Sequence, residues 1–133
     1  MRLDHVTLRT CDLPGLRRFF EDVFDLEDGY RPAFGFAGHW LYEGHEPLVH
    51  LVPGQPDASG TAGGAERIDH VAFLRDDYAS FRARLDARLI PYNRMELPEI
   101  GERRLFLHAP GGVLIEVAFR DSPAIQSLQE RSP

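Results

Sequence analysis

The sequence contains no lysine, and all fifteen of its basic residues are arginine. This absence excludes catalysis through a lysine Schiff base and excludes the lysine of a phosphate-binding P-loop. A single cysteine, Cys11, excludes an internal disulfide framework. The apolar runs are too short to span a bilayer, and the N-terminus has no apolar signal core. We therefore expect a cytoplasmic protein without a membrane partner.

Basic charge is also scarce overall, because the 133 residues carry a formal net charge of −6. Nucleic acids select clustered basic surfaces, so we expect no nucleic-acid partner. The hydrophobic share of 43% is enough to bury a core. The chain length fits one ordinary domain or two very small modules.

An internal repeat organises the chain. Residues 4–8 (Asp-His-Val-Thr-Leu) recur as residues 69–73 (Asp-His-Val-Ala-Phe), and residues 47–52 align with 112–118. His70 follows His5 by 65 positions, and Glu116 follows His50 by 66. Two aligned segments with nearly constant spacing indicate a duplicated module.

Each repeat is predicted to fold as a strand, a helix and three further strands, which gives an α+β fold of two βαβββ modules. We expect a first module over 1–53, a flexible linker over 54–66, a second module over 67–120 and a polar tail over 121–133. Asp12 and either Asp76 or Asp77 are expected to cap the two helices. The expected elements are 3–10, 13–25, 29–34, 38–43 and 47–53, then 67–75, 77–89, 92–96, 103–109 and 112–119.

Alternation along the strands places four candidate metal ligands on the faces away from the helices. In each strand the bulky apolar residues should pack against the helix, which leaves His5, His50, His70 and Glu116 on the opposite face. Burying a carboxylate such as Glu116 is costly, and either a metal ion or an arginine partner would remove that cost. We predict a metal site at His5, His70 and Glu116. His50 is either a fourth ligand or a group that supports the ligands.

The same alternation suggests which residues line a substrate cleft. Trp40 and Tyr42 are expected to share a face. Arg104 and Phe106 are expected to share another, opposite Leu105, and Arg104 there can meet an anionic substrate.

The repeated modules, the paired Asp-His-Val strands and the late Leu-Ile-Glu-Val strand resemble the vicinal oxygen chelate superfamily, which includes glyoxalase I, methylmalonyl-CoA epimerase and extradiol dioxygenases. The resemblance covers the chain from Leu3 to Phe119. It implies curved mixed sheets with the helices on the outer face, and ligands at His5, His70 and Glu116. It also implies a fourth ligand position at His50, where glutamate or glutamine is usual, and a substrate-binding role for Arg9.

The resemblance implies a glyoxalase-like lyase or isomerase that binds one divalent ion (Zn, Ni, Co, Mn or Fe(II)) and a small substrate with two adjacent oxygens. In that scheme Glu116 or His50 acts as the catalytic base. Two alternatives stay open: an Fe(II) extradiol-type dioxygenase, and a metal-free protein that binds a drug. A homodimer is expected, and if its modules pair across chains, His5 and His50 of one chain meet His70 and Glu116 of the other.

Overall fold

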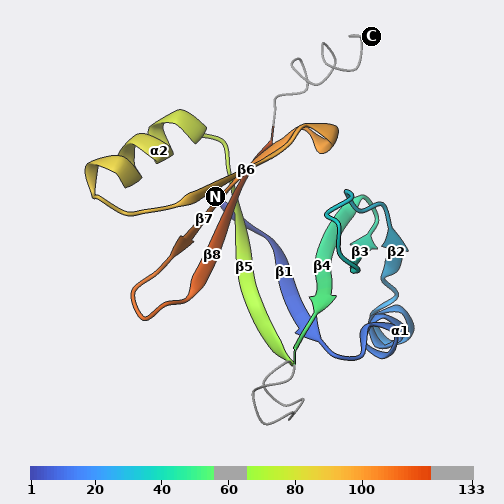
Figure 1. Ribbon diagram of the computed structural model, residues 1–133. Coiled ribbons are helices and arrows are strands. Elements are labelled where there is room, and N and C mark those ends of the chain that lie inside the picture. The colour runs from blue at the N-terminus through green and yellow to red at the C-terminus, as the bar shows by residue number, and fades with distance from the viewer. Residues whose placement is uncertain (56–65, 121–133) are drawn as a thin grey trace. The chain divides into compact units, whose positions relative to one another are not determined.

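The computed structural model describes residues 1–55 and 66–120. The predicted α+β class and the repeated order of strand, helix and three strands are confirmed (Figure 1). Most of the expected linker and the whole of the expected tail lie outside the described residues. The elements are β1 (Arg2–Thr10), α1 (Leu13–Phe24), β2 (Glu27–Gly29), β3 (His39–Glu43), β4 (Glu46–Pro53), β5 (Arg67–Arg75), α2 (Tyr78–Ala87), β6 (Asn93–Leu97), the short 3-10 helix η2 (Pro98–Ile100), β7 (Glu102–His108) and β8 (Leu114–Arg120).

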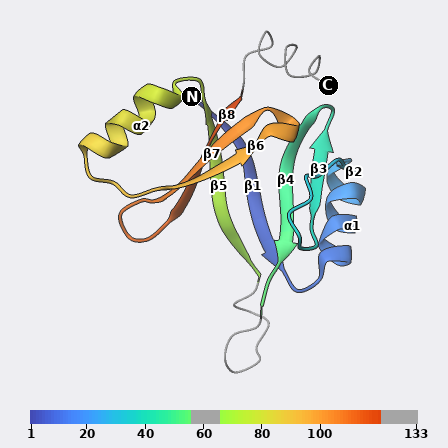
Figure 2. The same ribbon diagram turned by 45° about the horizontal axis from the view of Figure 1, so that its top comes forward.

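The chain divides into two compact units, which are described separately. The first unit is Asp4–Val71, and the second comprises Met1–Leu3 and the chain from Ala72 onward. The strand order is β2-β3-β4-β1-β5 in the first unit and β5-β8-β7-β6 in the second, so β5 contributes to both. β1 pairs with β4 in parallel, whereas the β3–β4, β6–β7 and β7–β8 pairs are antiparallel. The sheet is therefore mixed, and β1 and β4 lie side by side in both ribbon views (Figures 1 and 2).

In the first unit, α1 packs on the apolar face of the strands. The buried residues of this core are Leu26, Leu41, Val49 and Leu51, and partly buried Val6, Leu8, Leu13, Leu16, Phe20 and Leu48 pack against them. The helix begins after Asp12, whose carboxylate accepts a hydrogen bond from the amide of Gly15 at 3.0 Å. This confirms Asp12 as the N-cap and satisfies an amide that lacks a partner within the helix.

In the second unit, α2 packs on an equivalent core. Its buried residues are Leu85, Leu105, Val117 and Phe119, with Tyr78, Phe81, Ile90, Tyr92, Leu107 and Ile115 packed around them. Asp77 occupies the N-cap position, but its carboxylate makes no capping hydrogen bond. The guanidinium of Arg75 holds both carboxylate oxygens instead, at 2.8 and 2.6 Å. A bidentate, charge-assisted pair outcompetes a single bond to an amide.

The strand expected over 29–34 is wrong in its position, since β2 covers only Glu27–Gly29. Pro32 removes a backbone donor from this segment, and Gly35 adopts a positive φ of 81°. The guanidinium of Arg31 lies 4.8 Å from the ring centre of Phe34 and 4.9 Å from that of Phe36. These cation–π contacts hold the segment as a folded loop rather than as an extended strand.

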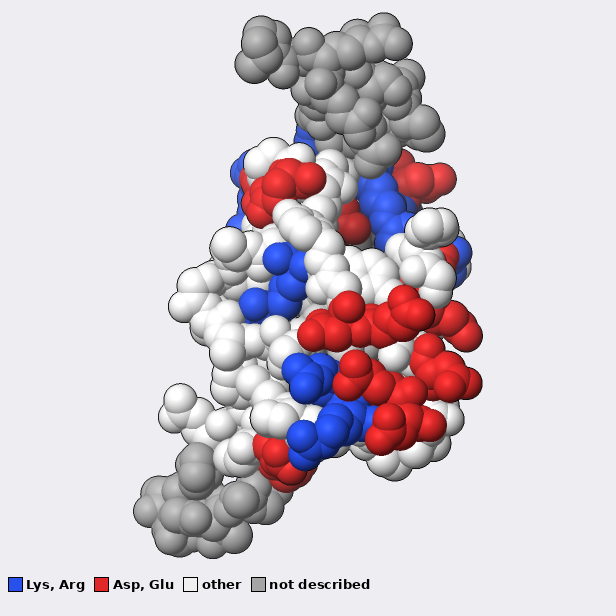
Figure 3. All heavy atoms as spheres, turned by 90° about the vertical axis from the view of Figure 1, so that its right-hand side faces the viewer, with Lys and Arg blue, Asp and Glu red and all other residues white. Residues whose placement is uncertain are grey.

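Acidic side chains gather on one side of the first unit (Figure 3). The segment that ends α1 and enters β2 is rich in acidic residues, which are Glu21, Asp22, Asp25, Glu27 and Asp28. A surface of this kind repels a phosphate backbone. Within the described residues, no helix is long and apolar enough to cross a membrane.

Candidate metal centre

His5 and His70 lie together in the first unit. Val6 and Leu8 of β1 pack toward α1, so the intervening positions turn His5 and Thr7 to the opposite face, as the alternation predicts. His5 is 2% exposed. The ring centroids of His5 and His70 are 6.0 Å apart and the ring planes meet at 77°. Rings set at this angle can direct nitrogen lone pairs toward a common point.

Each of these two histidines is oriented by the aspartate that precedes it. Nδ1 of His5 lies 2.7 Å from Oδ2 of Asp4, and Nδ1 of His70 lies 2.8 Å from Oδ2 of Asp69. An ionised carboxylate can only accept a hydrogen bond, so both Nδ1 atoms carry the proton. The neutral ring then presents its lone pair at Nε2. This is the arrangement of metal-binding histidines, whose second nitrogen usually donates to a carboxylate or carbonyl.

Asp69 is itself held in place by Arg9. Burial raises the pKa of the Asp69 carboxyl, but hydrogen bonds from His70 and Arg9 outweigh that effect and hold the pKa below its ordinary value. Nε of Arg9 donates to Oδ1 of Asp69 at 2.6 Å, and Nη1 of Arg9 donates to the carbonyl of Pro53 at 2.9 Å. Arg9 therefore binds the same carboxylate that orients His70. Its expected contact with a substrate stays a prediction.

The hydroxyl of Thr7 completes the surroundings of His70, with Oγ1 at 3.2 Å from Nε2. Because the proton of the neutral His70 ring is on Nδ1, the hydroxyl is the donor in this contact. Thr7 thus marks the position toward which the Nε2 lone pair points.

His50 lies in the same unit but in a different setting. Its ring stacks on that of His5, with centroids 3.7 Å apart and an interplanar angle of 15°. It also stacks on Trp40, at 4.1 Å and 13°. Nε2 of His50 lies 3.1 Å from the carbonyl oxygen of Pro47, and a carbonyl can only accept, so Nε2 of His50 carries the proton.

Glu116 belongs to the second unit and is 1% exposed. Ile115 and Val117 pack toward α2, so Glu116 is on the opposite face of β8, as predicted. Nη1 of Arg104 lies 3.3 Å from Oε1 of Glu116, while Nε and Nη2 of Arg104 donate to Oε2 of Glu102 at 3.0 and 2.8 Å. The arginine partner considered for this buried carboxylate is therefore present.

Glu102 extends this set of charges toward the surface. Its Oε1 accepts from Nε of Arg120 at 3.3 Å. A row of alternating charge therefore runs along β7 and β8. In order, it consists of Glu116, Arg104, Glu102 and Arg120. Arg104 is 5% exposed and lies between two carboxylates, so the expectation that it meets an anionic substrate stays a prediction.

The other predicted cleft residues are placed as follows. Trp40 is 4% exposed and stacks on His50. The pairing of β3 with β4 shifts register between Leu41 and Tyr42, so simple alternation does not carry through to Tyr42. The hydroxyl of Tyr42 donates to the carbonyl of Tyr30 at 2.6 Å. Phe106 is half-buried directly opposite Glu116 in the β7–β8 ladder.

Sequence reasoning missed the residues that support these side chains. Asp4 and Asp69 were visible as half of the repeated Asp-His pair, and the recurrence itself was the signal that they act on the histidines. Thr7 shares the face of His5, which alternation alone indicates. Glu102 gave no signal, because only the fold brings it to Arg104.

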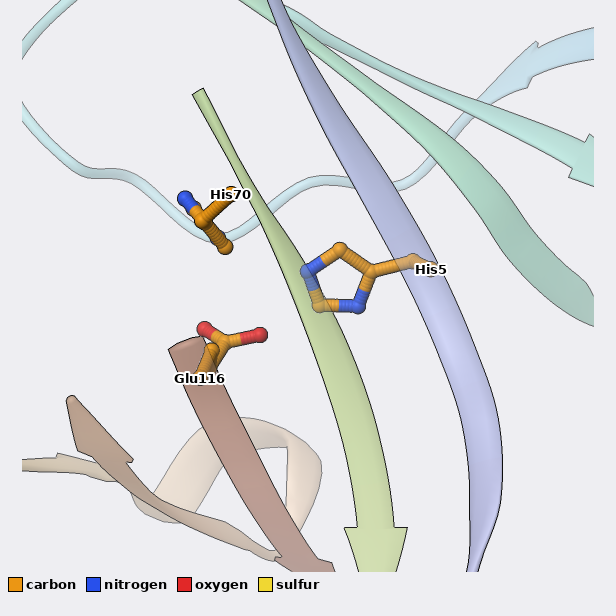
Figure 4. A group of neighbouring side chains, drawn as sticks. All are labelled: His5, His70 and Glu116. Carbon is orange, nitrogen blue, oxygen red and sulfur yellow. The ribbon is translucent and has the colours of Figure 1, made fainter. Parts of the chain in front are cut away.

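The side chains of His5, His70 and Glu116 are drawn in Figure 4 on the strands that carry them. Two imidazoles and one carboxylate are a donor set that can hold a divalent metal ion. The fit is supported by the protonated Nδ1 of His5 and of His70, because each ring then offers Nε2 as the coordinating atom.

The fold agrees with the resemblance noted in the sequence, which is confirmed at the level of the fold alone. No protein-family model matches the sequence, and the comparison with curated proteins finds no similar chain. Similarity appears among solved structures instead.

Methylmalonyl-CoA epimerase from Mycobacterium tuberculosis is similar with a TM-score of 0.68 and 18% identity, over 95% of this chain and 91% of that one. The Streptomyces coelicolor methylmalonyl-CoA epimerase in complex with 2-nitronate-propionyl-CoA gives 0.63 and 20%, over 92% and 99% of the two chains. The 2,3-dioxygenase LapB from Pseudomonas sp. KL28 gives 0.69 and 21%, over 91% of this chain but 41% of that one.

Proposed function

We propose that this protein is a divalent-metal-dependent enzyme of the glyoxalase-like type, a lyase or isomerase, with His5, His70 and Glu116 as its ligands. Its substrate is a small molecule that binds the ion through two adjacent oxygens. The observation that carries the proposal is the matched pair of Asp-oriented histidines, of which His5 is buried and His70 is partly buried, each with its proton on Nδ1. An ion bound at Nε2 of His70 would replace the hydrogen bond that this atom accepts from the hydroxyl of Thr7. Joining Glu116 of the second unit to these two histidines is part of the proposal.

The comparisons favour an isomerase or lyase over the larger oxygenases. The chain spans almost the whole length of the epimerases that share its fold, but less than half of the LapB dioxygenase.

Each residue of the proposed site would have a distinct chemical role. His5 and His70 bind through Nε2, with Asp4 and Asp69 fixing their tautomers. A divalent ion held by these residues would supply Lewis-acid chemistry, that is, stabilisation of negative charge on two substrate oxygens. Glu116 supplies the carboxylate that is either a ligand or a proton acceptor, and the guanidinium of Arg104 balances its charge in the folded protein.

An Fe(II) extradiol-type dioxygenase is the second candidate, favoured by one observation. His50 is stacked on His5 rather than set at an angle to it, which leaves two histidines and a carboxylate. That combination with open coordination positions is typical of non-haem iron oxygenases.

We also propose a homodimer, since symmetric dimers are the commonest soluble oligomers. The structure narrows how a shared site can be built. His5, His50 and His70 lie in one unit of a single chain, which supports a site whose three histidines come from the same chain. A shared site would take only Glu116 from the partner. Co-refolding His70→Ala with Glu116→Ala protein tests this, since shared sites would regenerate zinc binding and self-contained sites would not.

Elemental analysis of protein purified without chelator tests the proposed function. Zinc, nickel, cobalt or manganese near one ion per chain supports the isomerase or lyase, and iron supports the dioxygenase. The matched control is His45→Ala, which removes an exposed histidine from the turn between β3 and β4. Absence of any stoichiometric metal, with no binding of added zinc, would overturn both.

A further inference from the structure

We infer that His50 is a positioning residue for His5 and not a metal ligand. This inference rests on the proposed metal site. It selects one of the two roles that the sequence left open for His50, a fourth ligand or a group that supports the ligands. The geometry of the three histidines in the first unit carries it.

The first observation is the proton distribution on the rings. His5 and His70 donate through Nδ1 to carboxylates and therefore present Nε2. His50 has the opposite pattern, because its Nε2 donates to the carbonyl of Pro47 at 3.1 Å. A neutral His50 therefore has its lone pair on Nδ1 rather than on Nε2, and whether Nδ1 can reach an ion bound by His5 depends on the planes of the two rings.

The second observation is the angle between the rings. An imidazole binds a metal ion through a lone pair in the plane of the ring, about 2.0–2.1 Å from the nitrogen for zinc. His5 and His50 are nearly parallel, at 15°, with centroids 3.7 Å apart. An ion in the plane of His5 would therefore lie roughly 3 Å outside the plane of His50, where no lone pair points. By contrast, the 77° between His5 and His70 allows both planes to contain one ion.

The third observation is the layered packing around His50. Two rings cannot occupy the same face of an imidazole, so Trp40 and His5 cover opposite faces of His50. All three are nearly fully buried, at 4%, 4% and 2% exposure for Trp40, His50 and His5. Backbone pairing holds the stack together, because Trp40 and Thr7 are the direct neighbours of His50 on β3 and β1. His50 thus fixes the plane of the His5 ring, and with it the direction of its Nε2 lone pair.

A zinc titration followed by nitrogen-15 NMR of the histidine rings tests the inference in the intact protein. Before zinc is added, His50 should appear as the Nε2-protonated tautomer, and His5 and His70 as the Nδ1-protonated one. On adding zinc, the Nε2 resonances of His5 and His70 should shift, and neither ring nitrogen of His50 should show the shift of a ligated atom. A ligation shift at His50 would overturn the inference. A titration in which none of the three responds would overturn the proposed metal site as well.

Two substitutions separate positioning from ligation by a second measurement. His50→Phe keeps an aromatic ring between Trp40 and His5 but removes both nitrogens, and should hold zinc within about threefold of the wild-type Kd. His50→Ala removes the stack and should weaken zinc binding by about tenfold, as loss of a supporting group does. Melting temperatures of the metal-free variants check that each one folds. Equal loss of zinc in His50→Phe and His70→Ala would identify His50 as a ligand, and unchanged zinc affinity in His50→Ala would deny it any positioning role.

Discussion

The two repeats carry different side chains at corresponding positions of the same fold, a histidine in the first and a glutamate in the second. In the first unit, β4 carries His50 directly opposite Trp40 of β3. In the second, β8 carries Glu116 directly opposite Phe106 of β7, and each member of this pair follows its counterpart by 66 positions. The cross-strand aromatic neighbour is retained, but the imidazole stacks on its aromatic neighbour while the carboxylate is bound by Arg104.

The difference shows how a duplicated module can be adapted without changing its fold. Both cores use the same alternation, with apolar side chains toward the helix. The opposite face is then available to vary. In the first unit it became a stack of aromatic and histidine rings, and in the second it became the row of charges from Glu116 to Arg120. We therefore expect substitutions on the two faces to differ in their effects, with metal binding affected most in the first unit and stability in the second.

The largest effect is expected on metal binding in the first unit. His5→Ala and His70→Ala should each raise the Kd for zinc by more than about 100-fold, because a lost ligand costs more than a lost supporting residue. Calorimetric titration of metal-free protein measures this. His45→Ala should bind as the wild type does, and similar affinities in all three variants would remove His5 and His70 from the site.

In the second unit the largest effect is expected on stability. Arg104→Ala leaves Glu102 and Glu116 buried without their shared guanidinium and should lower the free energy of unfolding by about 3–5 kcal/mol. Its neighbour Arg103 pairs with Glu96 at 3.8 Å where both side chains are about half exposed, so Arg103→Ala should cost under about 1 kcal/mol. Urea unfolding compares the two, and equal losses would show that the row of charges is not a stabilising feature.

The aspartates behind the histidines should give an intermediate effect on metal binding. Asp69→Asn cannot provide the ionised carboxylate that fixes the tautomer of His70, so zinc should bind about tenfold more weakly. Asp4→Asn should behave similarly through His5. Asp76→Asn, in the turn after β5, is the control and should leave the Kd unchanged. If the Kd for zinc were unaltered in both Asp4→Asn and Asp69→Asn, the aspartates of the Asp-His pairs would have no part in metal binding.

The smallest effect distinguishes the starts of the two helices. Asp12 caps α1 through its carboxylate, so Asp12→Ala should lower stability by about 1 kcal/mol. Asp77 makes no such bond at α2, and Asp77→Ala should cost less than Asp12→Ala. Thermal unfolding should show the difference as roughly 4 °C or less in melting temperature. The reverse order would mean that the Arg75–Asp77 pair matters more for α2 than the cap does for α1.

Much of the fold was predictable because period and repetition are local properties of the chain. The alternation of Val6 and Leu8 with His5 predicted the faces of β1, and the repeated Asp-His pair predicted a second equivalent strand. The segment after Gly29 was not predictable, because the contacts of Arg31 with the rings of Phe34 and Phe36 depend on the folded chain and override strand propensity.

The candidate site was predictable in its residues but not in its geometry. Alternation put His50 on the same face as His5, yet the two rings stack, and only the structure distinguishes a stacked ring from a convergent one. The partnership of Arg104 with Glu102 likewise depends on side-chain directions in β7, since both residues lie on one face two positions apart. Residue type and face follow from sequence, whereas ring planes and proton positions depend on neighbours distant in the chain.

The central claim is that Glu116 shares one ion with His5 and His70, and zinc titration of Glu116→Gln tests it most directly. Glutamine keeps the size of the side chain and can still accept a hydrogen bond from Arg104, but it removes the charge of the ligand. The account predicts one zinc per chain in the wild type and a Kd at least about tenfold higher in Glu116→Gln. One zinc per chain with the wild-type Kd in Glu116→Gln would contradict it.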